Sequence, residues 1–168
     1  MDTSTMDQSM WKQLLPSEQA THHLGKTIGQ LLQGGEVLAL MGELGAGKTT
    51  LVRGIALGAG IAPEAVSSPT FTLVQEYRGP IFLVHVDLYR IHQSHDLDHL
   101  GLSDYFDGQH TVVIEWADRA SSTLVADHLQ IYLCHHTQQS RTVTLQPTGP
   151  RSETFFMQIT QSFSPSHS

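Results

Sequence analysis

The sequence predicts an α/β fold whose mixed central sheet combines a parallel core with antiparallel hairpins. An apolar run over residues 36–41 leads into a glycine-rich loop and then into a segment, residues 50–58, with helical spacing of its apolar residues. Strand, loop and helix in this order are typical of one unit of a parallel sheet. Two pairs of strand-like segments are each joined by a short polar turn, which indicates β-hairpins. These pairs are residues 72–77 with 81–86 and residues 130–135 with 141–146.

The first helix is expected to begin at Ser17, which follows Pro16. A serine at this position is a good N-cap, because its hydroxyl accepts a hydrogen bond from the first turn of the helix. The apolar face of this helix consists of Ala20, Leu24, Ile28, Leu31 and Leu32. Gly34 and Gly35 end the pattern. Residues 1–10 are polar, and we expect them to be flexible.

Residues 42–49 match the phosphate-binding loop motif G-x-x-x-x-G-K-[ST] at every fixed position. The glycines allow backbone N–H groups to turn toward a polyphosphate at low steric cost. Lys48 offers a positive charge to the outer phosphates, and Thr49 offers an oxygen to Mg²⁺. The predicted fold is therefore a three-layer sandwich like that of the P-loop NTPases. We predict that a nucleotide is bound by the residues of this loop and the start of its helix: Gly42, Glu43, Leu44, Gly45, Ala46, Gly47, Lys48, Thr49 and Thr50.

Two acidic residues follow apolar, strand-like runs. Asp87 ends the run over residues 81–86, and Glu115 ends the run over residues 111–114. In P-loop folds, carboxylates at the ends of neighbouring strands lie close to the metal and the phosphates. One of the two is expected to hold Mg²⁺, directly or through its waters, and the other to orient or deprotonate the attacking water. The pattern leaves open which acid has which role. Together with Lys48, they are our predicted catalytic residues.

Two further features lie beside this predicted site. Ser68 and Thr70 follow the loop helix, where many phosphate-loop enzymes place a segment that senses the third phosphate. Trp116 comes directly after Glu115, and its ring either stacks near the nucleotide or fills the core.

The remaining segments are less regular. Residues 92–108 suggest one or two short helices, and Ser152 is a candidate cap for a last helix that carries Phe155, Phe156 and Ile159. The spacing of His92, His95 and His99 raises the alternative of a metal site. Because no Cys or Glu stands at ligand spacing, we interpret these histidines as a solvated face.

Composition limits the organisation and the partners. At 168 residues and 39% hydrophobic content, the chain is long enough for one core, and we expect a single domain over residues 11–162 with a flexible tail over 163–168. The formal charge of −7 and only nine Lys and Arg residues disfavour direct binding of nucleic acid. The single cysteine, Cys134, cannot form an intramolecular disulfide, and neither a membrane span nor a signal peptide is evident. We therefore expect a cytoplasmic protein.

Four ordered blocks together resemble the bacterial TsaE family, formerly called YjeE. These blocks are Gly-Glu-Leu-Gly-Ala-Gly-Lys-Thr-Thr at 42–50, Ser-Pro-Thr-Phe-Thr at 68–72, His-Val-Asp-Leu-Tyr-Arg at 85–90 and Ile-Glu-Trp at 114–116. The likeness runs from about residue 17 to residue 153. The phosphate loop is generic, whereas the Asp-Leu-Tyr-Arg and Glu-Trp blocks at these separations are specific to that family.

The resemblance implies a small ATPase that helps to make threonylcarbamoyladenosine at position 37 of tRNA. It implies that Thr49 and Glu115 hold Mg²⁺, that Asp87 lies close to the metal and the γ-phosphate, and that the start of the first helix, including Glu18, lies near the nucleotide. The implied partners are TsaB and TsaD, and tRNA is met only through that complex. The histidines after Arg90 and the acid Asp118 depart from the usual family pattern.

Three other functions are alternatives to this one. A GTPase switch normally reads guanine with an N-K-x-D loop, and the chain contains no asparagine. An ATP-dependent small-molecule kinase needs an acceptor pocket and several arginines on a closing lid, whereas the arginines here are spread over the chain. A nucleotide-switched binding module with negligible hydrolysis differs from the ATPase only in emphasis, and it stays open.

Overall fold

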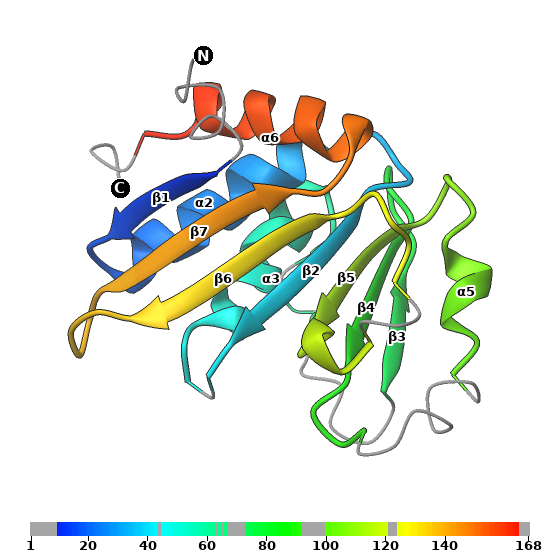
Figure 1. Ribbon diagram of the computed structural model, residues 1–168, viewed down its shortest axis with the longest axis horizontal. Helices are drawn as coiled ribbons and strands as arrows, with labels where there is room; N and C mark the ends of the chain where they lie inside the picture. The colour runs from blue at the N-terminus through cyan, green and yellow to red at the C-terminus, as the bar shows by residue number, and fades with distance from the viewer. Residues whose placement is uncertain are drawn as a thin grey trace, which may run out of the picture.

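The computed structural model describes residues 10–43, 45–62, 64, 66, 73–91, 100–120 and 124–164. Within these ranges the strands form one seven-stranded sheet, with the order β1-β7-β6-β2-β5-β4-β3 (Figure 1). The strands are β1 (Trp11–Leu15), β2 (Val37–Gly42), β3 (Val74–Tyr77), β4 (Leu83–Asp87), β5 (Thr111–Glu115), β6 (Leu129–His135) and β7 (Arg141–Pro147). The helices are α2 (Glu18–Leu31), α3 (Lys48–Gly58), α5 (Leu102–Tyr105) and α6 (Pro150–Ser162), with a 3₁₀ helix at Ala117–Ala120.

The sheet is mixed, as predicted. Strand β2 pairs in parallel with β5 and with β6, and β4 pairs in parallel with β5. The hairpins β3–β4 and β6–β7 are antiparallel, and so is the pairing of β1 with β7. Because parallel strands end at the same edge of a sheet, Gly42, Asp87 and Glu115 meet at one edge. Asp87 and Glu115 are direct partners in the register of β4 and β5.

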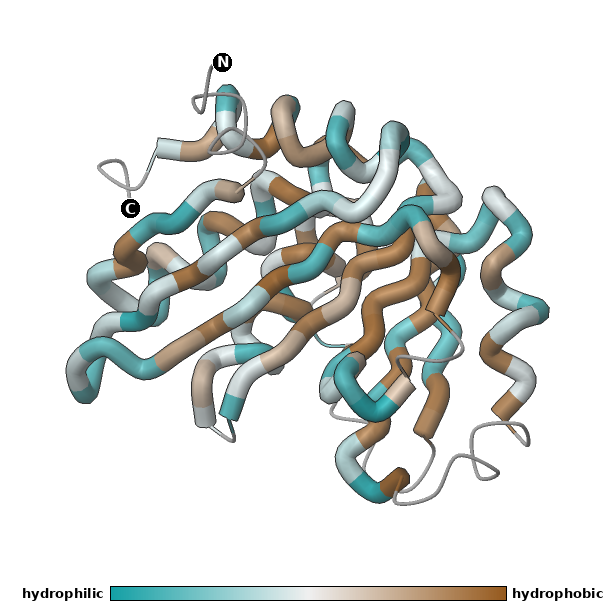
Figure 2. Tube along the Cα trace, in the orientation of Figure 1, coloured by the Kyte–Doolittle hydropathy of each residue, from teal (hydrophilic) through white to brown (hydrophobic). Residues whose placement is uncertain are grey.

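Apolar side chains fill both faces of the sheet and give the predicted three layers. One cluster joins α2, α3 and α6 to one face of the sheet through residues such as Leu24, Leu51 and Phe156. The other cluster joins α5 and the 3₁₀ helix to the opposite face through residues such as Leu102 and Ala117. The central parallel strands are the most continuously hydrophobic part of the trace (Figure 2). Strands covered on both faces are expected to have this composition.

Helices α2 and α3 cross with their backbones almost in contact. A Cβ atom added to Gly29 would lie 2.1 Å from the carbonyl oxygen of Ile55, and one added to Gly25 would lie 2.3 Å from that of Leu51. Gly54 in α3 faces α2 in the same way, because a Cβ atom added to it would lie 2.3 Å from the carbonyl oxygen of His22. This close packing holds the start of α2 beside the start of α3, where the phosphate loop ends.

Helices α2 and α3 begin as the sequence predicts. The hydroxyl of Ser17 accepts a hydrogen bond from the Ala20 N–H at 3.1 Å and caps α2. Helix α3 begins directly after the phosphate loop, with Gly47 in the left-handed region at φ 102°.

The ends of the chain differ from the prediction in three respects. Strand β1 was not predicted, and it forms an edge of the sheet by pairing with β7. Ser152 is not the N-cap residue of the last helix, because α6 already begins at Pro150, but its hydroxyl caps the helix start by accepting a hydrogen bond from the Gly149 N–H at 3.1 Å. The carboxylate of Asp127 also accepts hydrogen bonds from the N–H groups of Arg151 and Ser152, at 2.8 and 2.9 Å. Phe163, where we placed the start of the tail, is buried and contacts Trp11, so the packed part of the chain includes it.

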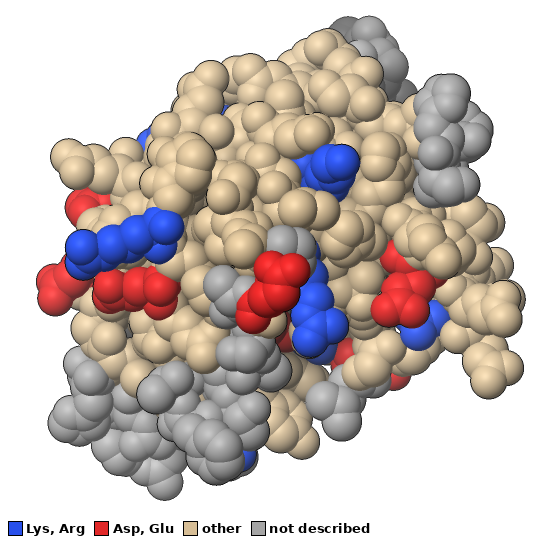
Figure 3. Space-filling model, turned by 180° about the vertical axis from the view of Figure 1, so that it is seen from behind, with Lys and Arg blue, Asp and Glu red and all other residues tan. Residues whose placement is uncertain are grey.

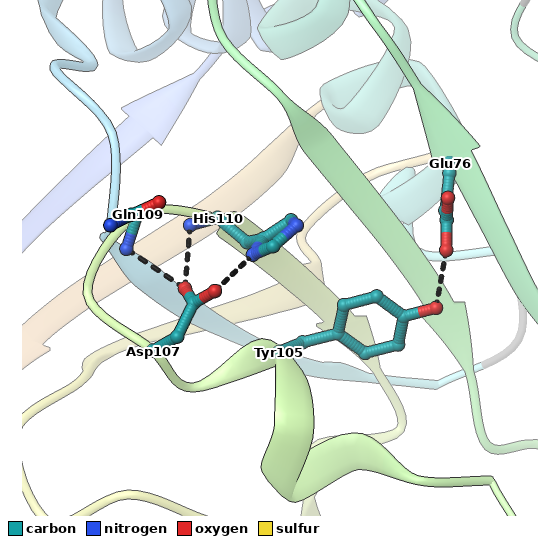
Figure 4. Close-up of polar contacts among 5 residues, drawn as sticks. All are labelled: Glu76, Tyr105, Asp107, Gln109 and His110. Atoms are coloured by element: carbon teal, nitrogen blue, oxygen red, sulfur yellow. Dashed lines mark hydrogen bonds and ion pairs between the residues drawn. The ribbon is translucent and has the colours of Figure 1, made fainter.

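Polar contacts fix the segment between α5 and β5 (Figure 4). The Tyr105 hydroxyl donates a hydrogen bond to the Glu76 carboxylate on β3. The Asp107 carboxylate accepts hydrogen bonds from the backbone N–H groups of Gln109 and His110, each at 2.9 Å. These hydrogen bonds close a tight turn that leads directly into β5.

Candidate functional site

The phosphate loop joins β2 to α3 and has the backbone conformation that its glycines permit. Gly45 and Gly47 have φ values of 79° and 102°, in the left-handed region that favours glycine. A Cβ atom on Gly42 would lie 2.5 Å from the carbonyl oxygen of Leu133, so β6 leaves no room for a side chain there. The loop therefore passes close to β6 before it enters α3, whose N-terminal N–H groups are free to face an anion.

The side chain of Lys48 lies over this loop. Its ammonium donates hydrogen bonds to the carbonyl oxygens of Gly42 and Glu43, the latter at 3.0 Å. Burial lowers the pKa of Lys48, while the negative charges of Glu115, Asp87 and Asp118 raise it and only partly offset the burial. The lysine thus lies within electrostatic reach of both predicted strand-end acids.

The two acids are close together, and each has one oxygen committed to the protein. Oδ1 of Asp87 accepts a hydrogen bond from the Tyr89 N–H at 3.0 Å. Oε2 of Glu115 lies 2.6 Å from Nε2 of His85, and both of these side chains are buried. Burial raises the pKa of Asp87, and the nearby Glu115 charge adds to this shift, whereas the bond from Tyr89 opposes it. Among the described residues, the other oxygen of each carboxylate has no hydrogen-bond partner, so the two acids can serve as metal ligands or as a base.

Trp116 covers the lysine. Its ring centroid lies 4.1 Å from Nζ of Lys48 and 5.1 Å from the ring centroid of Tyr89. The backbone of Trp116 has φ 59°, an uncommon value for a residue other than glycine. The guanidinium of Arg119 lies over the Trp116 and Tyr89 rings and donates hydrogen bonds to the turn that follows β4. Trp116 therefore belongs to the predicted site rather than only to the core.

A cleft of about 550 Å³ opens beside the loop. It is lined by Glu18 and its neighbours at the start of α2, by Gly45, Gly47 and Thr50, and by the turn of the β6–β7 hairpin. The Thr50 hydroxyl donates a hydrogen bond to Glu18 at 3.3 Å. Arg141 in β7 donates one to the carbonyl oxygen of Gly45, also at 3.3 Å. The start of α2 thus lies next to the phosphate loop.

The residues at this edge fit a Mg²⁺–nucleotide. A loop in which Gly45 and Gly47 adopt left-handed backbone conformations suits phosphate, and hydroxyl and carboxylate oxygens are the ligands that Mg²⁺ prefers. The candidates are Thr49, the second residue of α3, together with Asp87 and Glu115. Among the described residues there is no group of three His, Cys, Asp or Glu side chains that could hold a metal ion on its own.

Several predicted residues lie outside the described part of the chain. These are Leu44 in the loop, Ser68 and Thr70 in the predicted sensing segment, and the histidines of the alternative metal site, His92, His95 and His99. The remaining predicted site residues are brought to one edge of the sheet.

Residues 15–143 match the family described as threonylcarbamoyl adenosine biosynthesis protein TsaE. The chain belongs to the TsaE family. A relative from Bacillus subtilis is 38% identical over 149 residues, which cover 88% of this chain and 91% of the relative. A second, from Treponema pallidum, is 44% identical over 108 residues, 64% of this chain and 79% of the relative. Both are named tRNA threonylcarbamoyladenosine biosynthesis protein TsaE. The crystal structure of Bacillus subtilis YdiB is similar, with a TM-score of 0.77 and 32% identity over 90% of this chain and 95% of that one.

In this TsaE-family chain, sequence reasoning missed His85 and Arg119 as parts of the site. His85 looks like one more inward-facing residue of β4, since alternation along a strand does not reveal a polar contact with the next strand. Arg119 lies in an unpredicted 3₁₀ helix. Its contacts depend on how the turns after β4 and β5 meet, which no local pattern reports.

The surface agrees with the small number of basic residues. Seen from behind, the described Lys and Arg side chains form separate groups interleaved with Asp and Glu (Figure 3). This described face shows no continuous basic stripe of the kind that binds nucleic acid. None of the helices in the described ranges has the length and apolar character needed to cross a membrane.

Proposed function

We propose that the chain is a Mg²⁺-dependent ATPase of the cytoplasmic system that makes threonylcarbamoyladenosine in tRNA. Its partners in this proposal are TsaB and TsaD, and tRNA is met only through their complex. The family and the names of the relatives support the pathway. The observation that best supports ATPase activity is that Lys48, Asp87 and Glu115 lie together beside a loop in which Gly45 and Gly47 adopt left-handed backbone conformations.

Each residue has a distinct task in this proposal. The N–H groups of the loop and of α3 bind the phosphates, and Lys48 neutralises charge on the outer ones. Thr49 and Glu115 would hold Mg²⁺, and Asp87 would lie near the metal and the γ-phosphate. The cleft beside the start of α2 offers space for the nucleoside. Bound Mg²⁺ would supply charge stabilisation at the transferring phosphoryl group.

We expect the chain alone to hydrolyse ATP slowly, because its partners are expected to position the turns that carry the reacting groups. Trp116, Tyr89 and Arg119 tie the two turns beside the acids to each other and to Lys48. A partner that shifts these turns changes the positions of the reacting groups. Nucleotide state would bias partner affinity through the same contacts, because coupling between two sites is reciprocal.

The direct test mixes the chain with TsaB and TsaD from the same organism, with and without ATP. Complex formation is followed by size-exclusion chromatography, and phosphate release is measured in parallel. We expect slow release by the chain alone and faster release in the complex. The Lys48→Ala variant should lose the activity, whereas Lys26→Ala, on an exposed position of α2, should keep it.

Two results would count against the proposal. Fast ATP hydrolysis by the chain alone, at a rate that TsaB and TsaD do not change, would contradict the proposed partnership. ATP-dependent complex formation without any phosphate release would instead favour the nucleotide-switched binding module.

A further inference from the structure

We propose that His85 is a positioning residue, which fixes the Glu115 carboxylate in the orientation that metal binding or water activation requires. This inference rests on the proposed function, because that function gives Glu115 its metal-facing role. Neither the family resemblance nor the strand pattern assigned any task to His85.

The contact between the two side chains is short and buried. Nε2 of His85 lies 2.6 Å from Oε2 of Glu115, and the two residues are 1% and 4% exposed. A carboxylate offers only acceptor oxygens, so the Nε2–H group of His85 is the donor. A hydrogen bond to a charged acceptor is strong and directional when water is excluded. It engages Oε2 of Glu115 and leaves Oε1 for a metal or a metal-bound water.

The other ring nitrogen shows that the histidine is costly as a core residue. Nδ1 of His85 is buried and has no hydrogen-bond partner within the described part of the chain. Burying an unpaired polar atom costs about 1–3 kcal/mol. Leu83 and Val113, which lie on the same face of the sheet as His85, are buried and apolar, so an apolar side chain would suit the packing better. The bond to Glu115 is the feature that offsets this cost.

Glu115 needs such a partner because of where it lies. It is the last residue of β5 and is followed by Trp116, whose φ of 59° turns the chain sharply away. The glutamate side chain has three torsions, and Asp87 beside it carries a charge of the same sign. A side chain fixed before the metal arrives loses less entropy on binding. The hydrogen bond from the Tyr89 N–H fixes the Asp87 carboxylate in the same way.

Three substitutions separate positioning from packing. His85→Leu fills similar space without a donor. His85→Gln places an N–H donor near the original Nε2 position, and His85→Asn is one methylene too short to reach Glu115. Partners of metal ligands typically contribute 10–100-fold to metal affinity or activity. In the complex with TsaB and TsaD, we expect His85→Leu and His85→Asn to lower kcat or raise the half-saturating Mg²⁺ concentration by about that factor. The KM for ATP should stay at the parent value, and His85→Gln should recover most of the loss.

A double-mutant cycle tests whether His85 acts through Glu115. In a Glu115→Ala background, His85→Leu should cause no further loss of kcat, because the side chain that it positions is gone. A loss that multiplies with that of Glu115→Ala would overturn the proposal. So would a folded His85→Leu variant with the parent's kcat and Mg²⁺ dependence, or equal behaviour of the Gln and Asn variants.

Imidazole ¹⁵N NMR of the nucleotide-free protein provides a readout that does not depend on catalysis. A protonated Nε2 of His85 should give a strongly hydrogen-bonded signal that shifts in Glu115→Gln, and the other histidines serve as internal controls. An unchanged His85 signal would contradict the contact. If the parent protein failed to hydrolyse ATP, the proposed function would fall, and this NMR result would still decide whether His85 holds Glu115.

Discussion

Nζ of Lys48 lies 4.1 Å from the centre of the Trp116 ring, and it donates hydrogen bonds to two carbonyl oxygens of its own loop. The lysine that we expect to bind the outer phosphates is therefore folded back over the loop in this structure. A phosphate competes for the same ammonium with a stronger, charge-assisted interaction. We predict that nucleotide binding draws Lys48 away from the indole and changes the fluorescence of Trp116.

The chain has two tryptophans, so the signal can be assigned. Trp11 lies on β1 against Phe163, at the edge of the sheet formed by β1. The change on adding Mg²⁺–ATP should persist in Trp11→Phe and disappear in Trp116→Phe. A change that survives in Trp116→Phe would mean that the ring does not report on the lysine.

The two strand-end acids should be separable by kinetics. Asp87→Asn and Glu115→Gln keep the shape of each side chain and remove its charge. We expect each to lower kcat by about 10²-fold or more, the usual contribution of a positioned base or charge. Glu115→Gln should also raise the Mg²⁺ requirement. Asp118→Asn is the matched control, since this acid is exposed and adjoins the site, and its kcat should stay close to that of the parent protein. Parent-like kinetics in both acid variants would show that they have been assigned wrongly.

The close crossing of α2 and α3 should depend on glycine. In Gly29→Ala the new methyl group would lie 2.1 Å from the Ile55 carbonyl oxygen, so the helices must separate. Overpacking of this kind costs about 1–3 kcal/mol in the free energy of unfolding. Urea denaturation measures this loss, and Gln30→Ala on the exposed face of α2 should show almost none. ATP affinity should also fall, because α2 forms one wall of the cleft.

Acid should weaken the turn before β5. Hydrogen bonds from the backbone N–H groups of His110 and Gln109 lower the pKa of Asp107 to about 2. Since this value lies below the ordinary one, the carboxylate stabilises the fold above about pH 4, and this contribution is lost as the pH falls toward 2. A ¹³C carboxyl titration by NMR should show the low pKa. In Asp107→Asn, stability should fall less steeply over that range, and an ordinary pKa for Asp107 would refute the prediction.

The sequence predicted the phosphate loop and both strand-end acids because each depends on local spacing. Lys48 and Thr49 occupy fixed positions of a motif, and a strand that stops at an acid places that acid at the edge of the sheet. The helix start at Ser17 was equally local and was confirmed.

What the sequence did not reveal depends on contacts between distant segments. Strand β1 is recognisable only through its pairing with β7, since it is an edge strand with alternating exposure. At the start of α6, the Arg151 N–H donates to Asp127, which lies 24 residues earlier in the chain, and no local pattern shows this contact. His85 belongs to the site only through the pairing of β4 with β5, which brings Nε2 of its ring to 2.6 Å from Oε2 of Glu115.

Isothermal titration calorimetry of the nucleotide is the most direct test of the central claim, that the glycine loop and Lys48 form a receptor for Mg²⁺–nucleotide. We predict a measurable heat of binding for ATP and ADP with Mg²⁺ present, lost or strongly weakened in Lys48→Ala and kept in Lys26→Ala. Absence of binding heat in the correctly folded parent protein, over a range of temperatures, would contradict the account.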